Sequence, residues 1–195
     1  MAGRTRDERI DRAVLDATVE LLGEVSYPAL SMGAVAQRAG VHRPAVYRRW
    51  PSKRHLVVDA VADGLGLHPT PDTGDLRADL VAGITTIVDA LVGTALGHVL
   101  PALVADLAAD PELAERFRDQ VFHPRRATTA ATLRSAARRG EIRADFDMDF
   151  VLDALAAPLY YRALFGHLPL TRALAEQCVD GVLADLRTPG GHPAP

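Results

Sequence analysis

The sequence is poor in the residues that build disulfides and reactive thiol sites. Its 195 residues include one cysteine, Cys178, and one tryptophan, Trp50, and aromatic residues make up only 5% of the chain. A single cysteine excludes an internal disulfide and a cysteine-based zinc site within one chain. Cys178 lies in the apolar, helix-like stretch ALAEQCVDGVLADL. This context predicts a small buried side chain and not a catalytic nucleophile.

Long apolar runs and cofactor motifs are also missing. Nowhere do 18 uncharged apolar residues follow one another, and the N-terminus has no continuous apolar signal segment. There is no phosphate loop, no dinucleotide fingerprint and no His-x-x-x-His pair. DFDMD at 145–149 begins like a calcium loop, but Phe150 and Ala156 replace its glycine and glutamate. We therefore expect a soluble, cytoplasmic protein without a metal, a cofactor or membrane contact, and no nucleophile–base pair suggests an enzyme.

Apolar residues recur with helical spacing along almost the whole chain, which predicts an all-α protein. The expected helices cover residues 7–22, 32–39, about 43–50, 53–65, 76–96, 98–108, 111–122, 125–139, 148–165 and 171–187. Ser31 and Ser52 are expected to cap the second and fourth helices, and Asp147 or Asp149 a later one. Turn-forming residues at 66–75 predict an N-terminal domain of residues 1–55, a linking helix at about 53–65 and a larger domain of residues 66–195.

Positive charge is concentrated near the N-terminus, although the formal net charge of the chain is −3. Residues 1–55 carry 10 Lys or Arg and 6 Asp or Glu, whereas the remaining residues carry 12 and 19. Between residues 31 and 55 there are six basic residues and no acidic one, and they include Lys53, the only lysine. A nucleic-acid-binding surface requires such a local excess, although an arginine cluster alone is also typical of a solvated surface.

Two short helices joined by residues 39–41, Ala-Gly-Val, predict a helix-turn-helix whose second helix fits the major groove of B-DNA. Arg43 is the first candidate for reading a base, because a guanidinium can bond guanine O6 and N7 together, and Arg48 is the second. Candidates for phosphate contacts are Ser31, His42, Tyr47, Arg49 and Lys53. Trp50 is expected in the core and not between bases, because it falls where the third helix meets the first.

Residues 30–57, LSMGAVAQRAGVHRPAVYRRWPSKRHLV, resemble the DNA-binding signature of the tetracycline-repressor (TetR/AcrR) family of bacterial transcriptional regulators. The matching residues are Val35-Ala36, Ala39-Gly40-Val41, Tyr47, Trp50, Ser52 and Lys53. With the first helix the resemblance covers about residues 7–66, and beyond it only helix rhythm, length and RGEI at 139–142 match. It implies an all-helical homodimer whose N-terminal domain binds double-stranded operator DNA and whose C-terminal domain binds a small molecule.

The resemblance also implies roles for single residues. Arg43, Pro44, Ala45 and Arg48 would face bases, whereas Ser31, Tyr47, Arg49 and Lys53 would hold phosphates. His42 replaces the usual serine or threonine at the start of the recognition helix, so it either weakens the N-cap or adds a DNA contact with some pH dependence. Ser26 stands where the family often has glycine. A twofold dimer would present two recognition helices and require a pseudo-palindromic operator.

The C-terminal part offers candidates for a dimer interface and for an effector cavity. The last two expected helices carry wide apolar faces, which would pack between subunits or complete the core of one protomer. The interface candidates are Val151, Leu155, Leu159, Leu174, Val182 and Leu186. Polar residues among apolar ones are candidates for lining the cavity, although each alone is also typical of a core or surface residue: Thr85, Thr86, His98, His123, Tyr160, Tyr161 and His167.

The functional hypothesis is a DNA-binding repressor that an unidentified small-molecule effector releases from its operator, with residues 53–65 as the hinge. Such coupling requires the effector to have unequal affinity for two states of the protein. The alternatives are an activator, a regulator that responds to a partner protein, and a small helical enzyme.

Overall fold

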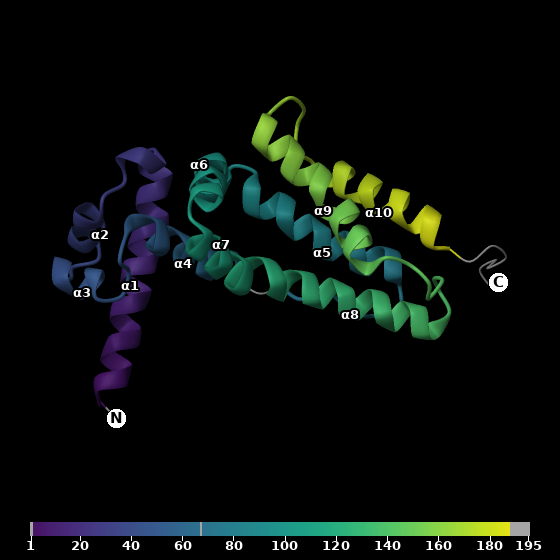
Figure 1. Ribbon diagram of the computed structural model, residues 1–195, viewed down its shortest axis with the longest axis horizontal. Coiled ribbons are helices and arrows are strands. Elements are labelled where there is room, and N and C mark those ends of the chain that lie inside the picture. Colours follow the sequence, from purple (N-terminus) through teal and green to yellow (C-terminus); the bar gives the residue numbers. More distant parts are fainter. Residues whose placement is uncertain (1, 67, 188–195) are drawn as a thin grey trace. The chain divides into compact units, whose positions relative to one another are not determined.

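The computed structural model describes residues 2–66 and 68–187, with side chains from residue 7 onward, and no β-strand occurs in these ranges. The elements are α1 (Ala2–Glu24), the 3-10 helix η1 (Tyr27–Ala29), α2 (Met32–Arg38), α3 (Arg43–Tyr47), α4 (Lys53–Leu65), α5 (Leu76–Leu91), α6 (Ala95–Ala109), α7 (Pro111–Phe117), the π-helix η2 (Arg118–Phe122), α8 (His123–Arg139), α9 (Met148–Phe165) and α10 (Arg172–Leu186) (Figure 1). The predicted all-α class is confirmed. No single helix in the described ranges is long and apolar enough to cross a membrane.

Two of the three predicted helix caps form as expected. The Ser31 hydroxyl accepts a hydrogen bond from the Ala34 N–H (3.2 Å) at the start of α2. The Asp147 carboxylate accepts bonds from two backbone N–H groups at the start of α9 (3.0 and 3.1 Å). Ser52 precedes α4 but makes no capping bond, because its hydroxyl lies 2.9 Å from the His55 Nδ1 atom. The prediction of a Ser52 side-chain cap was therefore wrong.

The break expected at residue 97, between helices at 76–96 and 98–108, lies a few residues earlier in the structure. α5 ends at Leu91, and Gly93 takes the left-handed conformation with φ of 67°. The Thr94 hydroxyl then accepts a bond from the Gly97 N–H (3.2 Å) and starts α6. Apolar periodicity continues through this region, so the period alone did not place the break at the correct residues.

The chain forms two compact units. The first contains residues 1–66 and 93–122, and the second contains residues 67–92 and 123–195. Helices α6 and α7 and the π-helix η2 therefore share a unit with α1–α4, although the α5 segment separates them in sequence. The expected domains, 1–55 and 66–195, do not coincide with these units and stay a prediction.

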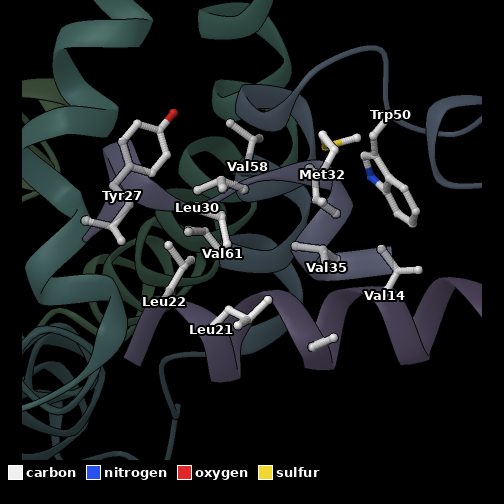
Figure 2. Packing of buried hydrophobic residues seen from close by; sticks show 14 of the residues in the cluster. Val14, Leu21, Leu22, Tyr27, Leu30, Met32, Val35, Trp50, Val58 and Val61 are labelled. Carbon is white, nitrogen blue, oxygen red and sulfur yellow. The ribbon is translucent and has the colours of Figure 1, made fainter. Parts of the chain in front are cut away.

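The core of the first unit joins helices that are far apart in sequence. Val14 from α1, Val35 from α2 and Trp50 from the turn after α3 lie among the buried side chains that Figure 2 shows. Leu103 from α6 and Leu113 from α7 belong to the same core and are fully buried. Trp50 is 4% exposed, so the prediction that it is a core residue is confirmed.

The core of the second unit lies between α5, α8, α9 and α10, and α9 and α10 lie side by side (Figure 1). Its fully buried leucines come from all four helices and are Leu80, Leu133, Leu155, Leu159 and Leu186. Each buried leucine contributes about 1.5–3 kcal/mol relative to an exposed one, so this packing is the main stabilising term of the unit.

The segment before α5 is held to α8 by a small polar contact. Thr70 is buried, and its hydroxyl lies 2.8 Å from the Thr129 hydroxyl. A Cβ atom at Gly83 of α5 would lie 2.5 Å from the Thr70 Oγ1 atom. Glycine is therefore required at position 83 for the close approach of this segment.

Candidate nucleic-acid interface

Helices α2 and α3 are joined by a turn that depends on Gly40. Gly40 has φ of 66°, which an L side chain disfavours. The Val41 N–H donates to the Ala36 carbonyl (2.9 Å) and the Gly40 N–H donates to the Gln37 carbonyl (3.2 Å). These two bonds form the Schellman arrangement that ends a helix. Val46 of α3 is fully buried beneath the turn, so the opposite side of this five-residue helix faces solvent.

The residues predicted to read bases lie on or beside this solvent-facing side. Arg43, Pro44 and Arg48 are exposed, and Ala45 is half-buried. Neither Arg43 nor Arg48 has an ion-pair partner among the described residues. Both guanidinium groups are therefore available to a ligand, and their base-reading role stays a prediction.

Three of the predicted phosphate residues are also exposed. They are Ser31, His42 and Tyr47, and the Tyr47 side chain is 53% exposed. His42 occupies the N-cap position of α3 and makes no side-chain capping bond, which agrees with the expectation that histidine weakens this cap. All three lie at the ends of α2 and α3, where side chains are well placed to contact a DNA backbone.

The Arg43 guanidinium lies against the first turn of α2. A Cβ atom at Gly33 would lie 2.5 Å from the Arg43 Nη2 atom and 2.8 Å from its Cζ atom. The glycine therefore leaves the space that Arg43 occupies when it folds back towards α2. This contact joins the two helices of the motif through the first candidate base reader.

Arg49 is held by the protein itself. Its side chain is 16% exposed and forms ion pairs with Asp7 and Asp11 of α1. Its Nη1 atom also donates to the Ala45 carbonyl (3.0 Å). In this structure Arg49 ties the end of α3 to α1, so a phosphate would have to compete with two carboxylates.

Lys53 is also engaged. Its Nζ atom donates to the Tyr27 carbonyl (2.9 Å) and the Pro28 carbonyl (3.2 Å), and it lies 4.8 Å from the centroid of the Tyr27 ring. The ammonium group therefore satisfies carbonyls of η1. The sequence pattern did not reveal this role because η1 is 25 residues away in the chain.

Two carboxylates that the sequence analysis missed connect the motif to α6 and α7. Asp59 of α4 accepts hydrogen bonds from Trp50 and Arg116, and Asp106 of α6 accepts one from the Tyr27 hydroxyl. Burial, and then the bond to Asp106, raise the pKa of the Tyr27 hydroxyl above its usual value. An acidic residue inside the apolar run LVVDAV was the only local signal of Asp59.

Three of the seven cavity candidates lie inside the second unit. Thr85 is buried, and its hydroxyl has no hydrogen-bond partner among the described residues. The Thr86 hydroxyl donates to the Gly83 carbonyl (2.6 Å) and accepts a bond from Arg125 (3.0 Å). Burial raises the pKa of the Tyr160 hydroxyl, and the Arg125 charge partly offsets this effect.

The other four candidates are exposed: His98, His123, Tyr161 and His167. Tyr161 and His167 form an edge-on ring pair with centroids 5.0 Å apart, and Phe165 lies 4.9 Å from Tyr161. These four side chains therefore do not line an interior cavity of the unit to which each belongs.

Five of the six interface candidates are core residues. They are Val151, Leu155, Leu159, Leu174 and Leu186. They pack in the core of the second unit, and Val151 and Leu174 also line an open groove on the surface of α9 and α10. This burial agrees with the alternative that the sequence left open, namely completion of the protomer core, and the interface role of these residues stays a prediction.

The surface of α9 and α10 instead carries an open groove of about 440 Å³. Val182, the sixth interface candidate, is half-buried and lines this groove. Phe150, Ala154 and Pro158 of α9 and Cys178 of α10 also line it. Burial raises the pKa of the Cys178 thiol, so it stays protonated near neutral pH.

The turn at Gly40, the exposed α3 and its unpaired arginines define a helix-turn-helix DNA-binding protein. Residues 14–60 match the family model for bacterial regulatory proteins of the tetR family. Residues 70–182 match the model for the C-terminal domain of tetracyclin repressor-like proteins. The chain belongs to the TetR family of transcriptional regulators, which confirms the family expected from residues 30–57.

Relatives of known sequence support this assignment. The chain is 31% identical over 163 residues to the uncharacterized HTH-type transcriptional regulator YdeS of Bacillus subtilis (strain 168), covering 83% of this chain and 82% of YdeS. It is 31% identical over 192 residues to the DNA-binding transcriptional repressor TetR of Mycobacteroides abscessus, covering 96% and 98%. These relatives and domains are transcriptional regulators and not enzymes, as the sequence predicted.

Solved structures show the same fold. The TetR family transcription regulator SCO0332 aligns with a TM-score of 0.75 and 33% identity, covering 92% of this chain and 99% of that one. FadR of Bacillus subtilis, solved in complex with stearoyl-CoA, aligns with a TM-score of 0.67 and 16% identity, covering 90% and 99%. At that identity the second likeness shows the fold alone.

Proposed function

We propose that this DNA-binding regulator is a repressor that binds a pseudo-palindromic operator as a homodimer and is released by a small-molecule effector. The observation that carries the proposal is the exposed face of α3 with two unpaired arginines, Arg43 and Arg48. A related protein of Mycobacteroides abscessus is named a repressor. Because operator DNA lies in the bacterial cytoplasm, the proposed function also places the protein there.

In this proposal α3 enters the major groove and reads base edges with Arg43, Pro44, Ala45 and Arg48. Ser31, His42 and Tyr47 contact phosphates on either side of the groove. Lys53 and Arg49 keep a supporting role, because both are already bonded within the first unit. Their effect on DNA affinity would then come from the positions of α3 and α4 more than from direct charge.

The groove between α9 and α10 supports the homodimer. Two large aromatic side chains on α9 are strongly exposed, Phe150 at 69% and Phe165 at 70%. Such side chains are enriched in interfaces, and a second copy of α9 would cover them. They join Val151, Leu174 and Val182, which line the groove, as interface candidates. Gel filtration with light scattering should give twice the chain mass of 20.9 kDa.

The second unit supports a ligand-binding role through its interior polar groups. The Thr85 hydroxyl is buried without a partner, and such groups are rare unless a ligand or water satisfies them. Tyr160 and Thr86 add two further half-buried hydroxyls. FadR of Bacillus subtilis, a fold neighbour, binds stearoyl-CoA, which makes an acyl-CoA a reasonable first probe.

The proposal is tested by selecting duplexes from a random library with the purified protein. We expect an enriched motif with two inverted half-sites, and we expect an effector to weaken binding to it. Stearoyl-CoA and other acyl-CoA probes are then titrated against the complex. An effector that binds tightly but leaves operator affinity unchanged would refute the coupling, and the absence of any enriched motif would refute operator reading.

A further inference from the structure

Helices α6 and α7 complete the unit that holds the DNA-binding motif. Leu103 of α6, Leu113 of α7 and Val121 of η2 are buried in the same core as Val35 and Trp50. This packing brings polar side chains of α6 and α7 next to α4. One of these contacts reaches the end of the recognition helix.

Asp59 of α4 lies at the centre of this contact. Its Oδ2 atom accepts a bond from the Trp50 indole N–H (2.9 Å) and one from the Arg116 Nη2 atom (2.7 Å). Its Oδ1 atom accepts from the Arg116 Nε atom (2.9 Å). The Asp59 side chain is only 18% exposed, so water screens these bonds weakly. The Asp59 carboxylate therefore binds both the Trp50 indole, beyond the end of α3, and the Arg116 guanidinium of α7.

The recognition helix depends on such support. α3 has five residues, which is too short to be stable alone, and its N-cap makes no side-chain bond. Its position is set by Val46 beneath it and by Trp50 just beyond its end. The Asp59 carboxylate therefore links Arg116 of α7 to Trp50, which helps to set the position of α3.

We propose that Asp59 is a positioning residue for operator reading, and that it couples the position of α7 to the recognition helix through Trp50. This inference rests on the proposed function, because it concerns how well α3 fits its operator. Neither Asp59 nor Arg116 needs to touch DNA in this role. The coupling is local to the first unit, and the residues that carry it are 57 positions apart.

The test compares Arg116→Gln and Asp59→Asn with the control Asp63→Asn. Asp63 lies one turn further along α4 and pairs with Arg12 of α1, so the control removes the same charge from the same helix. We expect Arg116→Gln and Asp59→Asn to weaken binding to the selected operator duplex about tenfold. Binding to a random duplex should change less than about threefold, and Asp63→Asn should leave both nearly unchanged.

A double-mutant cycle separates coupling from a general loss of stability. If Arg116 acts through Asp59, the variant with both substitutions loses no more operator affinity than the larger single loss. Arg116→Lys keeps the charge and one bond, so it should regain part of the lost affinity. Operator losses that add together, or that are matched by equal losses on random duplex, would overturn the positioning role.

Trp50 supplies a direct spectroscopic readout, because it is the only tryptophan in the chain. Its emission should shift in Arg116→Gln without DNA, although residue 116 lies on another helix, and should not shift in Asp63→Asn. Unchanged emission and operator affinity in a folded Arg116→Gln protein would refute this inference alone. A wild-type protein that binds no duplex selectively would refute the proposed function as well.

Discussion

Replacing Arg49 with methionine tests whether this arginine supports the fold or binds phosphate. Family resemblance assigns it to the DNA backbone, but the structure pairs it with Asp7 and Asp11 and with the Ala45 carbonyl. Methionine keeps an apolar stem of similar length, so the packing along the side chain is largely retained. The substitution therefore removes mainly the charge and its hydrogen bonds.

The expected cost follows from exposure. The Arg49 side chain is 16% exposed, whereas those of Asp7 and Asp11 are 65% and 44% exposed, so solvent screens both pairs. Exposed pairs contribute about 0.2–1 kcal/mol each, and the bond to the carbonyl adds about 1 kcal/mol. Together these terms give an expected loss of about 1.4–3 kcal/mol in the free energy of unfolding. A chain of this size loses about 2–4 °C in Tm per kcal/mol.

Thermal unfolding and the salt dependence of operator binding distinguish the two roles. A phosphate contact contributes about 0.9 to the slope of log K against log salt, so losing one in each half of a dimer lowers the slope by almost two. If Arg49 is structural, Arg49→Met lowers Tm and leaves this slope at its wild-type value. A slope reduced by about two with an unchanged Tm would refute the structural assignment.

Four further substitutions have distinct expected results. Arg43→Ala should reduce the binding free energy for the operator by about 1–3 kcal/mol and that for a random duplex far less. Equal losses on both duplexes would show that Arg43 does not read a base. Lys53→Ala should weaken binding to both duplexes and lower Tm. Gly33→Ala should displace the Arg43 guanidinium, since the added Cβ lies 2.5 Å from Nη2, and reduce operator selectivity with little change in Tm. The hydrogen bond from Arg77 lowers the pKa of Asp180 in the folded protein. The stability that this pair contributes is therefore present above the pKa of Asp180 in the unfolded chain and is lost as the pH falls through its pKa in the folded protein. Asp180→Asn should make Tm depend less on pH in that acidic range, and an unchanged pH profile of Tm would contradict this.

The sequence predicted a helix boundary well where a single capping or turn residue determines the backbone conformation. Ser31 starts α2, Gly40 ends it, and Asp147 starts α9. The break between α5 and α6 was expected at residue 97 and lies earlier, because Gly93 and Thr94 interrupt an apolar stretch without changing its period. The shared core of α6 and α7 with α1–α4 was also missed, because it depends on packing between distant segments.

The candidate interface was predicted from charge and spacing, which find exposed residues better than their partners. Arg43 and Arg48 are exposed as expected. Arg49 and Lys53 carry the same charge, but Arg49 pairs with Asp11 and Lys53 donates to carbonyls of η1. No local sequence pattern reveals these partners. Of the interface candidates, Leu155, Leu159 and Leu186 are fully buried in the protomer. An apolar helix face has the same sequence pattern whether a neighbouring helix or a partner chain covers it.

The number of chains on a selected duplex, measured together with its protected bases, tests the central claim most directly. If α3 reads DNA in a twofold dimer, two chains bind one duplex. They protect inverted half-sites about 34–36 Å apart or a multiple of that distance. Arg43→Ala then removes the protection of the same base in both half-sites. One chain per duplex, or protection that does not depend on sequence, would contradict the account.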